Sequence, residues 1–381
     1  MIKLLLLCLA GLPLLAQPAS KPGGKVRTYY VAADEVDWNY VPSGHDHMTG
    51  KPFDARGNIW VERTKNRIGA TFRKALYREY TDGTYSRLKP REGHWAHLGT
   101  LGPIFHAEVG DTLRIHFKNN ATKPYSMHPH GVFYKKDSEG ALYADGTSGA
   151  DKKDDAVPPG GTYTYVWEAV ERAGPGPGDG SSVVWLYHSH VNEPKDVNAG
   201  LIGAMVVTAR GQAKPDGSPR DVDRELFTLF MVYDENQSWY LDHNIATYTL
   251  DPKSVEKGEF LPVDIEGNSS LFVGGGSATV NHKYSINGYL FGNMPTMKMG
   301  VGERVRWYLL SIGDGFNFHS PHWHGNVTLS DNKRTDVITL LPAQMVVADM
   351  VPDNPGSWMF HCHISDHLEA GMHAHYEVLP K

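Results

Sequence analysis

The sequence is poor in cysteine: its 381 residues include two, Cys8 and Cys362. Cys8 lies in MIKLLLLCLAGLPLLAQPAS, where one lysine, a leucine-rich run and small residues are typical of a secretory signal peptide. We expect residues 1–19 to be a signal peptide cut near Ala16 or Ala19, with an uncleaved anchor as the alternative. Cys362 then remains alone, which excludes an intrachain disulfide. It is a reactive thiol, an intermolecular bridge or a metal ligand.

The sequence also lacks long apolar runs and blocks of like charge. The N-terminal apolar run is too short to span a bilayer comfortably, and no later run is long enough. The net charge is −6 without a large run of one sign. Nucleic acid and anionic membranes are therefore not expected partners. We expect a soluble, exported protein, periplasmic or secreted.

Convincing long helices are few, whereas strand patterns recur along the chain. Segments such as TLRIHFKN, SVVWLYHSH, RVRWYLLSIG and MHAHYEVL are rich in β-branched and aromatic residues, and 40 glycines and 24 prolines supply turns. We predict an all-β protein of β-sandwiches. The polar, turn-rich stretch at 210–223 predicts a boundary between a first domain at 24–210 and a second at 222–381.

The two halves resemble each other in sequence. YSMHPHGVFY parallels FHSPHWHGNVTL, VVWLYHSHV parallels SWMFHCHI, and AGLIGAMVV parallels AGMHAHYEV. Shared strand composition alone would not also align the histidines. A repeat of this length predicts two domains of one fold.

The 20 histidines are the compositional anomaly, and four His-x-His pairs lie at matching places in the two halves. The pairs are His128 with His130, His188 with His190, His322 with His324, and His361 with His363. On a strand, residues i and i+2 point to the same face, so each pair presents two imidazoles together. Four pairs at matching places predict a site for borderline metals such as copper rather than for calcium or magnesium.

Cys362 lies between the last two of these imidazoles and therefore faces the opposite way on a strand, into its own domain. There its thiol can meet His367, Met372 and His319 from an earlier strand. Two histidines, a thiolate and a weak axial methionine are the ligands of a blue-copper site. A buried, inert cysteine is the alternative.

The first half lacks all of these blue-copper ligands while it keeps both histidine pairs. Ser189 stands where the second half has Cys362, Tyr125 stands opposite His319, and Leu201 falls opposite Met372. This pattern predicts a shared cluster built by the pairs and a mononuclear site in the second half alone.

The motifs HPHG, HSH, HSPHWHG and HCHISDHLEAGM together resemble those of the multicopper oxidases, over nearly the whole chain after residue 20. The stretches HSHVNEPKDVNAGLIG and INGYLFGNMPTMKMGVGERVRWYLLSIG are similar to ceruloplasmin and its relatives. The two repeats resemble two-domain, laccase-like members. The resemblance implies two cupredoxin-like Greek-key β-sandwich domains.

The resemblance also implies four coppers per chain and a set of ligands for each. The type 1 copper would be held by His319, Cys362, His367 and axial Met372. The type 2 copper would be held by His128 and His322. The type 3 pair would be held by His130, His188, His190, His324, His361 and His363.

The reaction implied is one-electron oxidation of a small reductant coupled to four-electron reduction of O2 to water. Cys362 would pass electrons to the cluster. Asp145 resembles an acid near the cluster of two-domain relatives and is a candidate proton relay, with Asp336 as a second. An ordinary turn or surface aspartate is the alternative for both. Tyr134 is either redox-active or a packed aromatic, and we favour packing.

We expect a laccase-like oxidase of phenolic or other organic donors. A metal-ion oxidase of ferrous or cuprous ion is the alternative, which acids such as Asp366 and Glu369 in the type 1 ligand loop would favour. Copper nitrite reductase and a non-enzymatic copper protein are less favoured. Met294, Met297 and Met299 could bind cuprous ion, but we favour ordinary packing.

The cluster ligands divide equally between the halves, so the cluster must lie where a first domain meets a second. Six-domain relatives close a ring of six sandwiches, which three two-domain chains would reproduce. We therefore expect a homotrimer with clusters between subunits. A monomer with an intrachain cluster is the alternative.

Overall fold

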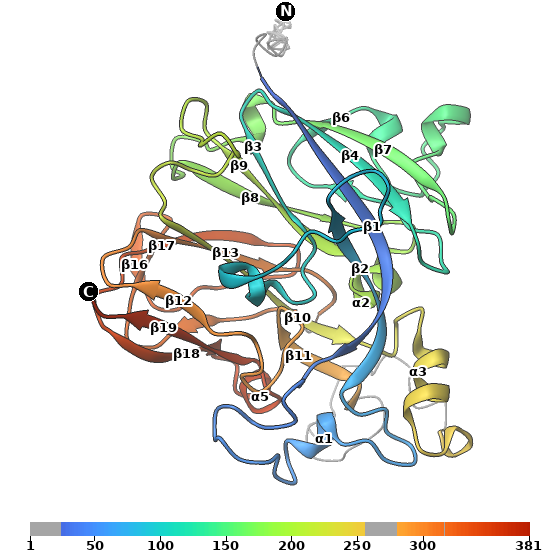
Figure 1. Ribbon diagram of the computed structural model, residues 1–381, viewed down its shortest axis with the longest axis vertical. Coiled ribbons are helices and arrows are strands. Elements are labelled where there is room, and N and C mark those ends of the chain that lie inside the picture. The colour runs from blue at the N-terminus through green and yellow to red at the C-terminus, as the bar shows by residue number, and fades with distance from the viewer. Residues whose placement is uncertain (1–23, 256–279, 316) are drawn as a thin grey trace, which may run out of the picture.

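The computed structural model describes residues 24–255, 280–315 and 317–381 (Figure 1). The predicted signal peptide at 1–19 and Cys8 lie outside these residues. No helix among the described residues combines the length and apolar character that crossing a membrane requires.

The described chain forms two β-sandwiches, one above the other in Figure 1. In the first, a sheet of order β2-β1-β4-β7-β6 packs on a sheet of order β3-β9-β8-β5. Its strands are β1 (Val26–Asn39), β2 (Thr71–Tyr80), β3 (Ile104–Glu108), β4 (Thr112–Asn119), β5 (His128–Pro129), β6 (Phe133–Tyr134), β7 (Thr162–Glu168), β8 (Ser182–His188) and β9 (Ile202–Thr208).

The second sandwich repeats this topology with one additional strand. A sheet of order β11-β10-β13-β17-β15-β16 packs on a sheet of order β12-β19-β18-β14. Its strands are β10 (Arg224–Asp234), β11 (His282–Ile286), β12 (Met297–Gly300), β13 (Val305–Ser311), β14 (Pro321–Trp323), β15 (Thr328–Ser330), β16 (Lys333–Thr335), β17 (Met345–Met350), β18 (Gly356–Cys362) and β19 (His373–Leu379). The predictions of an all-β fold and of an internal repeat are confirmed.

Helices are short, as the sequence predicted. Among the described residues they are α1 (Asn58–Val61), α2 (Glu193–Ala199), α3 (Leu241–Tyr248) and α5 (Ser365–Glu369). Helix α2 follows β8 and helix α5 follows β18. Each of these two helices therefore comes directly after a histidine pair in its own half. This placement repeats between the halves like the strands do.

The two sandwiches share a hydrophobic core. Leu186 on β8 and Ile202 on β9 belong to the same buried cluster as Phe227 on β10 and Trp307 on β13. The Ser182 hydroxyl lies 2.8 Å from the Tyr308 hydroxyl across the junction. Because these apolar side chains are buried between them, the two sandwiches are held in a fixed relative orientation.

Residues 40–70 follow the first strand of the first sandwich but pack on the second. The N–H of His47 donates to the carbonyl of Phe291 (3.0 Å), and the N–H of Leu290 donates to the carbonyl of Tyr40 (3.0 Å). The rings of Phe53 and Phe291 lie 5.2 Å apart. Figure 1 shows this segment, with α1, at the end of the second sandwich near α5.

Candidate copper centre

Strand register brings the histidine pairs together in each half. In the first half β5 pairs with β8 so that His128 stands opposite His188. In the second, β14 pairs with β18 so that His322 stands opposite His361. Directly opposed residues of antiparallel strands share a face, so the imidazoles of two pairs meet in each half.

The first-half imidazoles form a compact set. Nε2 of His130 lies 3.2 Å from Nε2 of His188. The His128 ring lies 5.2 Å from that of His190 and 5.6 Å from that of His188. All four pair members in this half therefore converge.

The second-half set repeats this arrangement. Nε2 of His324 lies 3.1 Å from Nε2 of His361. The His322 ring lies 5.3 Å from the rings of His361 and His363 and 4.9 Å from that of His324. Three of these imidazoles, those of His322, His324 and His361, bring nitrogens within 4.8 Å of one another.

Backbone carbonyls orient four of these rings. Nδ1 of His128 lies 2.7 Å from the carbonyl oxygen of Glu139, and Nδ1 of His322 lies 2.8 Å from that of Asp336. Nδ1 of His188 and of His361 contact the carbonyls of Ser189 (3.1 Å) and Cys362 (2.8 Å). An Nδ1–H donated to a carbonyl leaves Nε2 as the ligating nitrogen, which is the usual outer-sphere arrangement for a metal-bound histidine.

The two imidazole sets are separate within this chain. Across residues 24–255, 280–315 and 317–381, no aromatic ring contact joins a first-half pair to a second-half pair. Each set supplies one half of the ligands that the family motifs imply.

Three of the four predicted type 1 ligands, His319, Cys362 and His367, meet inside the second sandwich. Sγ of Cys362 lies 3.6 Å from Nδ1 of His367, which lies 3.2 Å from Nδ1 of His319. The backbone N–H of Ser320 also donates to Sγ (3.3 Å). Cys362 and Met372 are fully buried, and β18 points the thiol inward while His361 lies on the other face, as the alternation predicts.

Burial sets the electrostatics of these groups. It lowers the pKa of His367, His361 and His130 to about 4 and raises the pKa of the Cys362 thiol. The imidazoles are therefore neutral near pH 7, the form that binds metals. A metal lowers the pKa of a coordinating thiol and removes its proton.

The donor set fits copper. Nε2 of His319 is buried without a hydrogen-bond partner among the described residues, and its Nδ1 faces another imidazole. Two imidazoles, one thiolate and one thioether are soft and borderline donors, which suit copper and not calcium or magnesium.

The first half fills the equivalent position with a hydrogen-bond network. The N–H of Ser126 donates to Oγ of Ser189 (3.1 Å), which occupies the place of the thiol, and this hydroxyl donates to Asp196 (2.7 Å). Nε1 of Trp239 donates to the other carboxylate oxygen (2.8 Å). Tyr125 and Leu201 are fully buried beside it. Aligning the two halves of the sequence matched Ser189 with Cys362. The alignment missed Asp196, because Asp196 lies two positions farther from Ser189 than His367 lies from Cys362.

The two predicted acids have different surroundings. Asp145 forms ion pairs with Lys136 (2.6 Å) and Lys152 (2.8 Å), and the hydrogen bond from Lys136 is the main reason that its pKa is lowered. Oδ2 of Asp336 lies 3.9 Å from Nδ1 of His322, and its side chain is 54% exposed. Glu139 holds the place in the first half that Asp336 holds in the second, and sequence reasoning missed it because the intervening loops differ in length.

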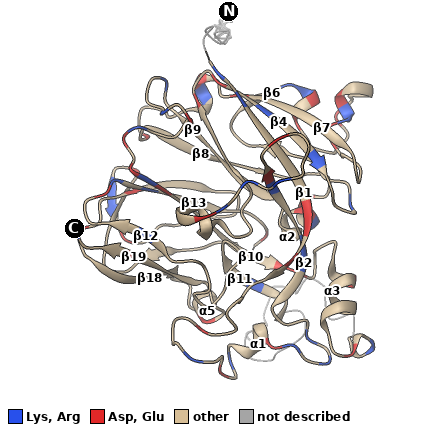
Figure 2. Ribbon diagram, in the orientation of Figure 1, with Lys and Arg blue, Asp and Glu red and all other residues tan. Residues whose placement is uncertain are grey.

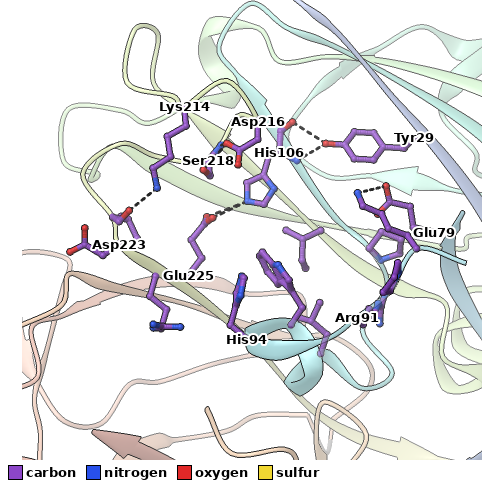
Figure 3. Close-up of a pocket in the computed structure, with 18 residues that line it drawn as sticks. Tyr29, Glu79, Arg91, His94, His106, Lys214, Asp216, Ser218, Asp223 and Glu225 are labelled. Atoms are coloured by element: carbon purple, nitrogen blue, oxygen red, sulfur yellow. Dashed lines mark hydrogen bonds and ion pairs between the residues drawn. The ribbon is translucent and has the colours of Figure 1, made fainter. Parts of the chain in front are cut away.

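The remaining candidates lie outside these sets. Met294, Met297 and Met299 are buried in the hydrophobic core, in agreement with ordinary packing. The Tyr134 ring lies 5.9 Å from that of His128. A cavity of about 570 Å³ between η1 (Gly93–Leu98), β3 and β10 is lined by His94, His106 and Glu225 among others, and includes none of the twelve predicted ligands (Figure 3).

Comparisons with known proteins identify the family to which this architecture belongs. The paired sandwiches, with convergent imidazole and thiolate groups, define a cupredoxin-like protein. Family motifs described as multicopper oxidase match residues 87–212 and 263–381, one in each half. The chain belongs to the multicopper oxidase family and is related to ceruloplasmin, as the sequence motifs predicted.

The most informative relatives are longer proteins. The chain is 48% identical to ferroxidase HEPHL1 of Homo sapiens, 42% to hephaestin of Mus musculus and 38% to ceruloplasmin of Homo sapiens. Each alignment covers 93% of this chain but 29%, 30% and 32% of the respective relative. The chain thus spans about a third of the length of these relatives.

Solved structures agree on the fold. A crystal structure of a multicopper oxidase superposes with a TM-score of 0.56 at 19% identity, covering 95% of this chain and 92% of that one. The blue copper oxidase from Nitrosomonas europaea superposes with a TM-score of 0.57 at 17% identity, covering 93% and 86%. At these identities the likeness concerns the fold alone.

Proposed function

We propose that this protein is an exported multicopper oxidase that couples oxidation of ferrous ion to reduction of O2 to water. The observation that carries the proposal is the pair of ligand sets around Cys362: the thiol faces one buried site and its neighbours His361 and His363 face another. Bound copper supplies one-electron redox chemistry at both sites. The peptide units on either side of Cys362 give a short covalent route from Sγ to both imidazoles.

Ferrous ion suits the surface next to His367. The Tyr284 ring packs 5.1 Å from the His367 ring, and the nearby carboxylates of Asp366, Asp314 and Asp234 add to the effect of burial in raising the pKa of Tyr284. Carboxylates attract and hold a hard divalent cation. The relative HEPHL1 is a ferroxidase, which supports the same substrate and favours a metal ion over a phenolic donor.

An organic donor is the second candidate, and one observation favours it. Phe318 is 49% exposed and its ring lies 6.4 Å from that of His367. An exposed aromatic ring beside the electron-entry imidazole offers a stacking surface for a phenol.

Between the two predicted acids, Asp336 fits a proton relay better. Its exposed carboxylate lies close to His322 and can exchange protons with water. Two lysines hold Asp145 in its ionised form, so it can orient Lys136 but is a poor proton donor near neutral pH.

We further propose a homotrimer with four coppers per chain, because the two imidazole sets of one chain do not meet. In a ring of three chains, the second-half set of one copy would face the first-half set of the next. Nothing in this arrangement requires a ligand residue that the chain lacks.

Oxygen consumption by the copper-loaded protein tests the substrate. We expect turnover with ferrous ion and a higher KM for ferrous ion in Asp366→Asn, with the rate for a phenol unchanged. Glu369→Gln is the matched control, because Glu369 is already paired with Arg56. Turnover of phenols alone would favour the laccase-like alternative, and nitrite turnover with two coppers per chain would indicate a nitrite reductase.

A further inference from the structure

The outer face of the sheet formed by β14, β18 and β19 carries more potential metal ligands than the copper sites use. Strand pairing aligns His322, His361 and His373 in one row across the three strands. One step along, the N–H of His324 donates to the carbonyl of Met359 (3.0 Å), and Met359 stands opposite His375. Residues in a row share a face, so the imidazoles continue beyond the cluster ligands onto β19.

The first half provides an internal comparison. There His128 and His188 align with Ile202, and the N–H of His130 donates to the carbonyl of Leu186, which stands opposite Ala204. These three aliphatic residues belong to the core cluster that both sandwiches share. The second half replaces all three with His373, Met359 and His375, none of which its predicted copper sites require.

A segment from the first half of the sequence covers this face. The position that a Cβ atom would take at Gly292 lies 3.1 Å from Sδ of Met48, 3.1 Å from Cβ of His47 and 3.6 Å from Cε1 of His375. Gly292 has a φ of +69° and no side chain, which leaves this space to its neighbours. Sδ of Met48 and the imidazole of His375 therefore lie close to the same point beside β19, and Met359 stands opposite His375 on β18. The ring of His47 is engaged elsewhere, with its Nε2 2.8 Å from Oγ of Ser43.

A buried polar atom beside this face lacks a partner. Nδ1 of His373 has no hydrogen-bond partner among the described residues, and water has little access to it because the residue is only 7% exposed. A buried unsatisfied nitrogen is costly and calls for a ligand or an ordered water. His373 lies between the converging side chains and His361.

We propose that Met48, Met359 and His375 form a further site that binds a cuprous ion on this face, next to the second-half imidazole set. Thioether and imidazole donors together select a soft monovalent ion such as Cu(I) over iron, calcium or magnesium. The half-buried side chains of Met48, Met359 and His375 give an ion access from solvent. His373 stands next to the predicted cluster ligand His361 on the neighbouring strand. This position suits a transient site that holds copper before the ion is transferred to the cluster. This inference does not depend on which reductant the oxidase uses.

Anaerobic competition with the Cu(I) indicator bicinchoninate tests the site in the copper-loaded full-length protein. We expect the unmodified protein to withhold one more Cu(I) per chain than the double variant Met359→Leu/His375→Gln. Each single variant should bind that ion about tenfold more weakly or worse. His45→Ala is the control, because His45 is an exposed histidine of the same segment whose Nδ1 contacts the carbonyl of Ser43.

A second readout separates ligand loss from misfolding. X-ray absorption of the extra Cu(I) should show sulfur scattering that weakens in Met48→Leu, while the blue type 1 absorption stays unchanged in every variant. Equal Cu(I) binding by the unmodified protein and the double variant would overturn the site. Equal loss in His45→Ala would overturn it as well.

Discussion

At the scale of single residues, the Cys362 side chain belongs to one predicted metal site, whereas the imidazoles of its neighbours His361 and His363 belong to another. Cys362→Ser removes the thiolate but leaves His361 on the other face of β18 and His363 directly after the strand. We expect loss of the blue absorption and of substrate oxidation, with a type 2 copper signal still present in electron paramagnetic resonance. Full oxidase activity in this variant would contradict the electron route through Sγ.

Ser189 is the natural control for that experiment because it occupies the same position in the first half. Ser189→Ala leaves the Asp196 carboxylate and the Ser126 N–H without that hydroxyl. We expect it to cost about 1–3 kcal/mol of stability while the blue absorption remains.

Buried imidazoles also make the metal-free protein sensitive to acid. The pKa of His130, His361 and His367 is about 4 in the folded state against an ordinary 6.5. Between these values the unfolded chain binds more protons, so the free energy of unfolding falls as the pH drops from about 6.5 towards 4. Urea unfolding of the metal-free protein across this window measures it, and a flat profile would contradict the burial of neutral imidazoles.

At the scale of elements, strand alternation allowed most of the site to be predicted from the sequence. Period-two geometry put Cys362 inside and His361 and His363 outside, and the repeat aligned all four histidine pairs. The position of residues 40–70 on the second sandwich could not be predicted, because it depends on contacts such as the Ser43 N–H with Oδ1 of Asn293 (3.1 Å), 250 positions away. The Asp145 ion pairs were missed for the same reason, since loops fold to meet partners that local patterns do not specify.

A buried ion pair fastens β2 to the end of β10. Lys74 lies 2.5 Å from Glu235, both side chains are inaccessible, and the ammonium also donates to the carbonyl of Asn198 (2.9 Å) in the last turn of α2. Glu235→Gln leaves the ammonium buried without its carboxylate and should cost about 3–5 kcal/mol in urea unfolding. Lys74→Met/Glu235→Leu should cost less than the single variant, because no charge remains buried.

An exposed pair provides the matching control. Arg304 and Asp223 lie 2.7 Å apart with side chains 53% and 43% exposed. Asp223→Asn should cost under about 1 kcal/mol, because solvent screens exposed pairs. Equal losses at the two pairs would contradict the structural role of the buried one.

At the scale of the whole molecule, charge does not favour a single type of macromolecular partner. Lysine and arginine alternate with aspartate and glutamate along the ribbon of both sandwiches in Figure 2. The proposed ring of three chains rests instead on the two imidazole sets, each of which supplies half of the ligands that the family motifs imply. Assembly and catalysis are therefore expected to be inseparable in this protein.

Subunit complementation tests that expectation directly. His188→Ala disables the first-half set and His361→Ala disables the second-half set, so each variant alone should lack a complete cluster and be inactive. In mixed trimers, an interface that joins the first half of one variant to the intact second half of the other would carry all eight imidazoles. Random mixing restores such interfaces at about a quarter of positions, so co-refolded variants should regain about that share of activity if the cluster lies between chains. Mixed variants that remain inactive while the unmodified protein sediments as an active monomer would place the whole cluster within one chain and overturn the ring.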